Sequence, residues 1–365
     1  MIRLCQPYVT KEMRQAALDT LKTRWIGQGP KVDQFEIAFQ NKLKTFPAIT
    51  TGSGTDALHL AYILAGIKPG DEVAVPVFTC TATNIPLLWM GAKLVFIDVD
   101  PITLNIDIDD LKRKVNRKTK AIVTVDYAGM PCDYDEIFKI AGNRPVIEDA
   151  AHAVGASYGG VPVGALSNFT MFSFQAIKHI TTGDGGMLCL NRKDVDRARL
   201  IRWFGIDRKD KFKSHGFWKG DIWEVGYKYQ MTDIAASMGM EALKTLDIQR
   251  DTRNYMESLY RELDGLPNIQ FLHEPEGRES GRWLMTVLVD NREKLIKYLL
   301  RNGIESNPLH YRNDQYTIFK KYKNRCPNMD RVEKKILCLP FHMGLSDTDI
   351  EEVKERVKKW ALMQS

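Results

Sequence analysis

Lys178 stands in a setting that suits a reactive amine. It lies in the segment 169–190 (FTMFSFQAIKHITTGDGGMLCL), where an apolar strand ends at Ser173 and a Gly-rich turn leads into a second strand. A lysine between two core strands is expected to face a cleft rather than bulk water. Desolvation there lowers the pKa of the amine and makes it a nucleophile suited to forming a Schiff base with an aldehyde. The alternative is a surface lysine.

A carboxylate and an imidazole follow another apolar strand, in the segment 146–156 (VIEDAAHAVGA). A pyridoxal ring is an electron sink while its ring nitrogen is protonated, and a carboxylate holds that proton. Asp149 is a candidate for this role, with a helix N-cap as the alternative. His152 would share a helical face with Asp149 and is a candidate to bond the phenolate oxygen of the ring. The alternative for His152 is a core histidine.

A turn after the strand Ala48–Thr51 has the composition of an anion site. Gly52, Ser53, Gly54 and Thr55 lead directly into a helix, where backbone amides and a hydroxyl are free to bind a phosphate. The turn has neither the GxGxxG spacing nor the P-loop lysine of the nucleotide-binding motifs. Ser173 is a candidate for a further hydroxyl on the phosphate. No cysteines or histidines have the spacing of a metal site.

The elements that must position these residues alternate between strand and helix. Nearly continuous apolar strands between helices predict an α/β fold, a three-layer sandwich with a mostly parallel central sheet. The strands are expected at Ala48–Thr51, Asp71–Val77, Lys93–Asp98, Ala121–Asp126, Pro145–Glu148, Phe169–Ser173 and Gly186–Leu190. Helices are expected at about 11–23, Val32–Lys44, Asp56–Ala65, Ala82–Trp89 and Tyr134–Ala141.

The pattern changes near residue 245, which predicts a large domain at 1–245 with an N-terminal helical arm and a smaller α+β domain at 246–365. A long helix is expected from Leu243 to about Leu263, followed by a turn at 264–267 that leads into the smaller domain. Its strands are expected at Trp283–Val289 and Ile304–Ser306, and its last helix at Asp347–Leu362.

Composition bounds the class of protein. The chain has 365 residues, is 44% hydrophobic and has a net charge of +6. This mild excess suits phosphorylated ligands and does not indicate nucleic acid. The basic run at 111–120 (LKRKVNRKTK) is expected to be a solvated helix end, with a polyanion-binding patch as the alternative. No apolar run is long enough for a membrane span, and no cysteine pair has CxxC spacing, so we expect a cytoplasmic protein with reduced thiols.

Taken together, these segments resemble the nucleotide-sugar aminotransferases of the DegT/StrS group, which share the type I pyridoxal-phosphate fold. The resemblance runs from WIGQGP (25–30) through GSGTDALHLA, GAKLVFIDVDP (91–101), EDAAHAVGA, SFQAIKHITTGDGG and GYKYQMTDIAASMG (226–239) to about Trp360. It implies pyridoxal 5'-phosphate as cofactor, with pyridoxamine phosphate formed during turnover. It also implies that Lys178 carries the cofactor as a Schiff base and shuttles the proton.

The resemblance assigns further residues around the cofactor. Asp149 would pair with the pyridinium, Ala151 would lie under one ring face, and His152 would meet the ring oxygen. Gly54, Thr55 and Ser173 would hold the phosphate. The family forms homodimers whose active sites borrow residues from the neighbouring subunit, and the segment 226–233 matches the borrowed loop.

This chain departs from the family pattern at three positions. Cys80 stands where the family usually has an aromatic residue stacked on the cofactor, so Phe78 is a candidate to replace that contact. In the borrowed loop, Lys228 replaces the common Asn and Gln230 the common Arg. Lys228 is still able to meet a phosphate.

The sugar contacts are predicted from a C-terminal segment (NPLHYRND, 307–314) that resembles the one closing over the substrate. His310 is a candidate sugar contact and Arg312 a candidate partner for a diphosphate. The alternatives are a domain-interface histidine and a surface arginine.

The leading hypothesis is an enzyme that moves an amino group from glutamate to a nucleotide-linked keto-sugar, a 4-keto-6-deoxyhexose or alternatively a 3-keto hexose. The product would enter a surface polysaccharide such as a lipopolysaccharide O-antigen or another glycan. One rival is a sugar dehydratase of the same fold, but such enzymes have His where this chain has Lys178. Another is a non-catalytic regulator that binds the cofactor and a sugar. A generic amino-acid aminotransferase would need a pair of arginines for two carboxylates, which the sequence does not reveal.

Overall fold

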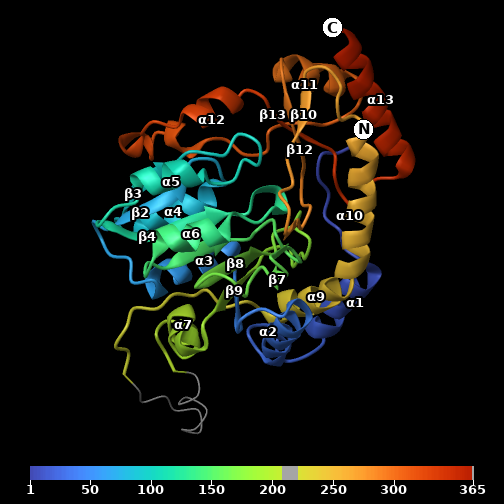
Figure 1. The fold of residues 1–365 in the computed structure, drawn as a ribbon. Coiled ribbons are helices and arrows are strands. Elements are labelled where there is room, and N and C mark those ends of the chain that lie inside the picture. The colour runs from blue at the N-terminus through green and yellow to red at the C-terminus, as the bar shows by residue number, and fades with distance from the viewer. Residues whose placement is uncertain (208–220, 364–365) are drawn as a thin grey trace.

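Seven strands form one sheet at the centre of the protein (Figure 1). The computed structural model describes residues 1–207 and 221–363. The strand order is β1-β9-β8-β5-β4-β2-β3, and within this sheet only β9 runs antiparallel to its neighbours. The strands are β1 (Ala48–Thr51), β2 (Glu72–Pro76), β3 (Lys93–Ile97), β4 (Thr119–Val125), β5 (Val146–Asp149), β8 (Phe169–Ser173) and β9 (Gly186–Leu190). The predicted mostly parallel central sheet is confirmed.

Helices cover both faces of this sheet, because alternate residues of each strand point to opposite faces. Val73 of β2 packs in one apolar cluster with Leu87, whereas its neighbour Ala74 packs in another with Ile137. The helices of this part are α1 (Lys11–Leu21), α2 (Pro30–Leu43), α3 (Gly54–Leu64), α4 (Thr81–Trp89), α5 (Ile108–Lys114), α6 (Tyr134–Ala141), α7 (Val195–Arg202) and α9 (Asp233–Lys244). The result is the three-layer α/β arrangement.

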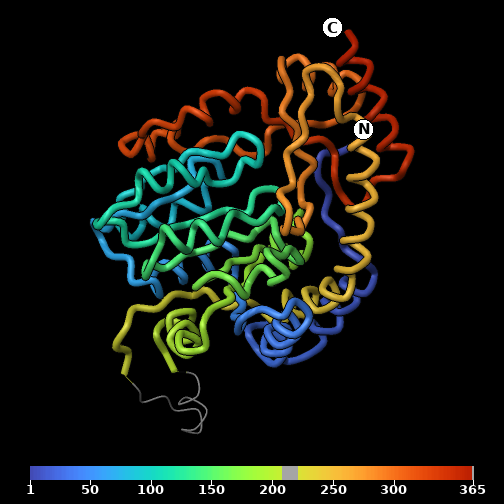
Figure 2. Tube along the Cα trace, viewed as in Figure 1, coloured from blue at the N-terminus to red at the C-terminus, as the bar shows by residue number. Residues whose placement is uncertain are grey.

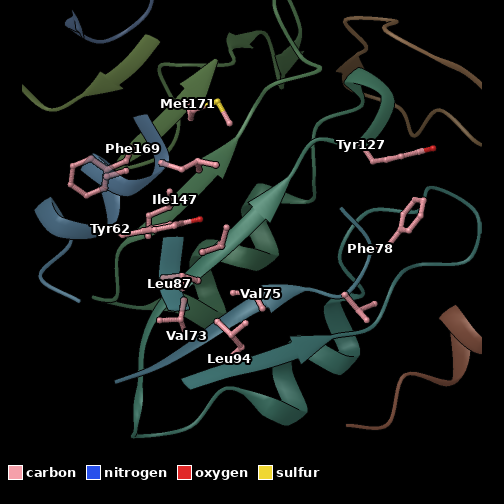
Figure 3. Close-up of a cluster of buried hydrophobic side chains, with 14 of the residues drawn as sticks. Tyr62, Val73, Val75, Phe78, Leu87, Leu94, Tyr127, Ile147, Phe169 and Met171 are labelled. Carbon is pink, nitrogen blue, oxygen red and sulfur yellow. The ribbon is translucent and has the colours of Figure 1, made fainter. Parts of the chain in front are cut away.

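The cluster between the sheet and helices α3 and α4 also supports the site. Figure 3 shows Val73 and Leu94 from the strands against Tyr62 and Leu87 from the helices. Tyr62 is fully buried, and its hydroxyl donates a 2.7 Å hydrogen bond to the carbonyl oxygen of Thr83. The core therefore fixes the first turn of α4, which begins at one edge of the site.

A second group of elements follows α9. Helix α10 (Leu246–Arg261) runs from α9 toward a three-stranded antiparallel sheet of order β10-β12-β13 (Figure 1). The elements here are β10 (Ile269–Phe271), β12 (Met285–Val289), β13 (Ile336–Leu339), α11 (Arg292–Arg301), α12 (Pro327–Val332) and α13 (Asp347–Met363). A third sheet joins the two groups through β6 (Ser157–Tyr158), β7 (Val161–Pro162) and β11 (Arg278–Glu279). Short 3-10 turns lie at Tyr127–Gly129, Arg192–Asp194, Asn313–Gln315 and Lys320–Tyr322.

Two predicted elements differ in the structure. The single helix expected from Leu243 to Leu263 is two helices, because α9 ends at Lys244 and α10 begins at Leu246. Thr245 lies between them, and its hydroxyl donates a 2.7 Å hydrogen bond to the carbonyl oxygen of Ala242. Instead of the strand expected at 304–306, only Ile304 pairs, in an isolated bridge with Ile2.

The N-terminal residues lie against the C-terminal elements (Figure 2). The amide of Ile2 donates to the carbonyl of Gly303 at 2.7 Å, and His342 Nε2 lies 3.1 Å from the carbonyl oxygen of Arg3. The division into domains at 245/246 stays a proposal. It is supported by the two separate sheets, although the first residues of the chain pack on the smaller part.

Among the described residues, no helix combines the length and the apolar character that crossing a membrane requires.

Candidate active site

Lys178 lies in the loop between β8 and β9. The loop is closed at its base, where the amide of Phe174 donates to Gly185 O at 2.8 Å and the amide of Thr182 donates to Phe174 O at 3.0 Å. The side chain of Lys178 is half-buried, and its Nζ lies 3.2 Å from the centroid of the Trp283 ring. Burial lowers the pKa of Lys178 to about 7, against the opposing attraction of Asp149. A large share of this amine is therefore neutral near neutral pH.

Asp149 is the last residue of β5, and it pairs in register with Val125 of β4 and Met171 of β8. The residue is 4% exposed. Burial raises the pKa of Asp149, while a hydrogen bond from Thr83, the backbone amide of Ala151 and the charge of Lys178 oppose the rise. Lys178 and Asp149 interact electrostatically, so the structure brings the predicted amine and the predicted carboxylate together.

Three aromatic side chains stack beside this pair. The ring of His152 lies 3.9 Å from that of Trp283, with 22° between their planes, and 5.3 Å from the nearly parallel ring of His310. Burial and the charge of Lys178 hold the pKa of His152 well below its usual value, and burial likewise lowers that of His310 to about 3. Both imidazoles are therefore neutral. The Nδ1 atom of His152 is buried without a hydrogen-bond partner and is free to meet a ligand.

The predicted anion site forms at the N-terminus of α3, next to the end of β8. Ser53 caps the helix, and its hydroxyl accepts a 3.1 Å hydrogen bond from the amide of Asp56. A Cβ atom added to Gly54 would lie 3.3 Å from Ser173 Oγ, which shows how closely the two residues approach. Thr55 occupies the first helical turn beside Gly54. The amides of this turn and the Ser173 hydroxyl are thus close enough to serve one anion.

These groups fit pyridoxal phosphate by their chemistry. Its aldehyde needs a neutral amine, its pyridine nitrogen a buried carboxylate, its ring oxygen a hydrogen-bonding partner, and its phosphate a helix N-terminus with hydroxyls. Lys178, Asp149, His152 and the turn containing Gly54 supply one of each. Ala151, which was predicted to lie under the ring, is half-buried and lies between Asp149 and His152 in the sequence. These roles stay predictions.

The segment 226–233 packs on its own chain beside the turn after β1, where the amide of Gly52 donates to the carbonyl oxygen of Tyr229 at 2.7 Å. Lys228 is exposed, and its Nζ lies 6.0 Å from the ring of Phe204. Tyr227 and Tyr229 on either side stack on each other at 4.9 Å, and Tyr229 Oη lies 2.9 Å from His59 Nδ1. The aromatic side chains hold the segment on its own chain, while Lys228 is exposed to solvent.

The predicted sugar contacts, His310 and Arg312, both line a cavity of about 390 Å³ that Phe78 also lines. Arg312 is buried, and its guanidinium is engaged by Asp314, by Glu333 at 2.8 Å and by Asp330. Its Nε and Nη2 atoms donate to the two carboxylate oxygens of Asp314 at 2.7 and 2.8 Å. The alternative of a surface arginine is therefore wrong, since Arg312 is a buried ion-pair centre, and its predicted contact with a diphosphate stays a prediction.

Cys80 is exposed at the N-cap of α4 and interacts electrostatically with Lys178. Phe78 is 2% exposed and packs 5.1 Å from the ring of Tyr127. Phe78 therefore belongs to the buried core, as Figure 3 also shows, and its candidacy as a ring stacker stays untested.

Two residues of the site were missed by sequence reasoning. Trp283 was placed only as the start of an apolar strand, and nothing in its neighbourhood signals a contact with Lys178. Thr83 lies in VFTCTAT (77–83), three residues after Cys80, where the chain departs from the family pattern. Its position at the start of a predicted helix was the available signal. The hydroxyl of Thr83, in α4, donates a hydrogen bond to the carboxylate of Asp149 at the end of β5. No local sequence pattern reveals this contact.

Comparison with known proteins gives the same family. Residues 7–358 match the DegT/DnrJ/EryC1/StrS aminotransferase family. The chain is 34% identical to the spore coat polysaccharide biosynthesis protein SpsC of Bacillus subtilis, covering 96% of this chain and 95% of that protein. It is 32% identical to GDP-perosamine synthase of Vibrio cholerae, covering 99% of both. The crystal structure of the sugar aminotransferase CalS13 from Micromonospora echinospora superposes with a TM-score of 0.92 at 31% identity, covering 98% of this chain and all of that one.

The family match spans nearly the whole chain, and the similar structure includes both groups of elements. The chain therefore belongs to the DegT/DnrJ/EryC1/StrS aminotransferase family, whose enzymes depend on pyridoxal phosphate.

Proposed function

We propose that this chain transfers an amino group from glutamate to the keto carbon of a nucleotide-linked sugar, a 4-keto-6-deoxyhexose, during synthesis of a surface polysaccharide. The observation that carries the proposal is the half-buried amine of Lys178 beside the buried carboxylate of Asp149. The sugar and the polysaccharide are supported by the names of the similar GDP-perosamine synthase and spore coat polysaccharide protein.

Lys178 would hold the cofactor covalently, and Asp149 would keep its ring nitrogen protonated. His152 would bond the ring oxygen and Ala151 would contact one ring face. Bound there, pyridoxal phosphate supplies an electron sink for the carbon that loses or gains a proton. Because burial places the pKa of Lys178 at about 7, its Nζ is able both to accept and to return that proton near neutral pH.

The remaining predicted contacts orient the cofactor and the sugar. Gly54, Thr55 and Ser173 would bind the cofactor phosphate, with the α3 terminus favouring its negative charge. His310, neutral and buried beside His152, would contact the sugar. Arg312 would contact the diphosphate at the cavity that both residues line.

The working form would be a homodimer in which Lys228 reaches the phosphate site of the neighbouring subunit. Two features support this arrangement. Lys228 is exposed, and no carboxylate in the described residues pairs with it. The nearby Trp223 and Val225 are 66% and 76% exposed, which is apolar area that a second subunit would cover. A cytoplasmic location is supported by the six cysteines, which are all free.

The test is a panel of nucleotide-linked 4-keto-6-deoxy and 3-keto hexoses, each incubated with glutamate and the cofactor-loaded protein and read by mass spectrometry. We expect one sugar to have its carbonyl oxygen replaced by an amino group, and Lys178→Ala to give none. A product that has instead lost water would favour the dehydratase. If every sugar is unchanged while Lys178→Ala still binds the cofactor, the hypothesis of a non-catalytic regulator replaces the proposal.

A further inference from the structure

Trp283 is fixed both at its backbone and at its indole. Its backbone amide donates to the carbonyl of Ala128 at 2.8 Å, and its Nε1 donates to the carbonyl of Ile177 at 2.9 Å. The side chain is 3% exposed. Because Ile177 precedes Lys178 directly, the ring and the backbone of the lysine loop cannot move independently.

The face of this ring is where the lysine amine lies. Lys178 Nζ is 3.2 Å from the ring centroid, well inside the distance of about 6 Å at which a cation is attracted by an aromatic face. Within the described residues no hydrogen bond or ion pair joins this Nζ to a carboxylate. Asp149 attracts it at longer range, and the two oxygens of Asp149 accept hydrogen bonds from Thr83 and Ala151.

The same indole also positions the neighbouring imidazole. His152 stacks on it at 3.9 Å, and His310 continues the stack. Both imidazoles are neutral, since burial keeps their pKa low, so they add no positive charge that would drive the amine from the ring. The stack thus gives the amine of Lys178 a fixed indole face whose neighbouring imidazoles are uncharged.

We propose that Trp283 is a positioning residue whose indole face holds the Lys178 amine whenever that amine is not bonded to the cofactor. The inference rests on the proposed function, because a lysine that holds the cofactor covalently must leave it when the substrate amine binds and return to it at the end of turnover. An aromatic face stabilises a cation by a factor of about 2 to 30, whereas a buried carboxylate partner holds it far more strongly. A weak, fixed contact therefore keeps the amine in place without preventing its return.

The experiment measures the pKa of Lys178 in cofactor-free protein, from the pH dependence of its modification by trinitrobenzenesulfonate, located by peptide mass spectrometry. The matched variants are Trp283→Phe, which keeps an aromatic face, and Trp283→Leu, which keeps apolar burial without one. Both lose the bond to Ile177, so their difference isolates the face. We expect about 7 for the wild type, and a value for the Leu variant lower than that of the Phe variant by about 0.4 to 1.5 units. Equal values in the two variants would overturn the inference.

A second measurement decides the question if the Leu variant does not fold. The protein has seven tryptophans, and growth on 5-fluorotryptophan weakens the π face of each with little change in shape. The pKa of Lys178 should then fall in the wild type and stay unchanged in Trp283→Phe grown in the same way. No fall in the wild type, or an equal fall in both, would refute the role of Trp283. None of these readouts uses a sugar, so an inactive sugar panel would refute the proposed function alone.

Discussion

The hydroxyl of Thr83 and the carboxylate of Asp149 are joined by a 2.6 Å hydrogen bond from Oγ1 to Oδ2. Thr83 has a single hydroxyl proton, which it donates to Asp149, so at the 2.7 Å contact with Thr79 it accepts. A relay from Thr79 through Thr83 therefore ends on the carboxylate. It opposes the effect of burial, which raises the pKa of Asp149, and it helps to keep charged the group proposed to pair with the cofactor.

Thr83→Val should weaken retention of the cofactor. A hydrogen bond to a charged group contributes about 1.5–3 kcal/mol, so its loss should raise the pKa of Asp149 by about one to two units and weaken cofactor binding roughly tenfold or more. The dissociation constant, measured by equilibrium dialysis, is the readout. Thr83→Ser keeps the hydroxyl and should bind as the wild type does. Unchanged binding in the Val variant would show that the relay does not act on the cofactor.

The strands around the lysine loop were predictable, because each is a short apolar run bounded by turn residues. Phe169–Ser173 and Gly186–Leu190 have the predicted bounds. The break at Thr245 was not predictable, because the apolar periodicity continues through it and only the two hydrogen bonds of the Thr245 hydroxyl mark it. The contacts of Thr83 and Trp283 were also beyond reach, since each joins segments distant in the chain.

Cys80→Phe should improve cofactor retention. Cys80 is exposed near Lys178, at the position where the family usually has a stacking aromatic residue. A stacked ring contributes about 0.5–1.5 kcal/mol, so dissociation should slow by about two- to tenfold. The rate of cofactor loss after dilution measures this, and Cys80→Leu controls for added apolar area. If Phe and Leu give the same rate, the ring does not stack on the cofactor.

Lys178→Met should stabilise the cofactor-free protein, most strongly at low pH. In the folded protein burial lowers the pKa of Lys178 to about 7, whereas the unfolded chain has the ordinary value near 10.5. Below pH 7 the buried amine is charged, and the wild type bears the full cost, at most about 5 kcal/mol. Between pH 7 and 10.5 the unfolded chain binds the extra proton, so wild-type stability rises with pH and the advantage of the variant shrinks. Urea unfolding at pH 6, 8 and 9.5 tests this, and a gain independent of pH would contradict the lowered pKa.

Lys178→Ala and Lys228→Ala should complement each other if active sites are shared between subunits. In a mixed dimer, one site combines an intact Lys178 with the intact Lys228 of the other chain. Random mixing should restore about a quarter of wild-type activity from two nearly inactive variants. Differently tagged chains, co-expressed and purified as the mixed species, provide a second measurement, in which about half of wild-type activity is expected because one of the two sites is complete. Absence of recovery in a verified mixed dimer would place Lys228 outside the neighbouring site.

Arg312→Met should destabilise the fold more than it changes chemistry. The guanidinium is 5% exposed and compensates Asp314, which is 0% exposed, as well as Glu333. Removing one partner of a buried ion pair typically costs about 3–5 kcal/mol, because the remaining charge stays buried without compensation. The midpoint of urea unfolding should fall accordingly, and the double variant Arg312→Met with Asp314→Asn should recover part of the loss.

Arg312→Lys separates the structural role from the proposed diphosphate contact. It keeps the charge, so binding of a diphosphate would appear as a higher KM for the nucleotide sugar with an unchanged KM for glutamate. If the KM values of the variant for both substrates match those of the wild type, Arg312 has the structural role alone.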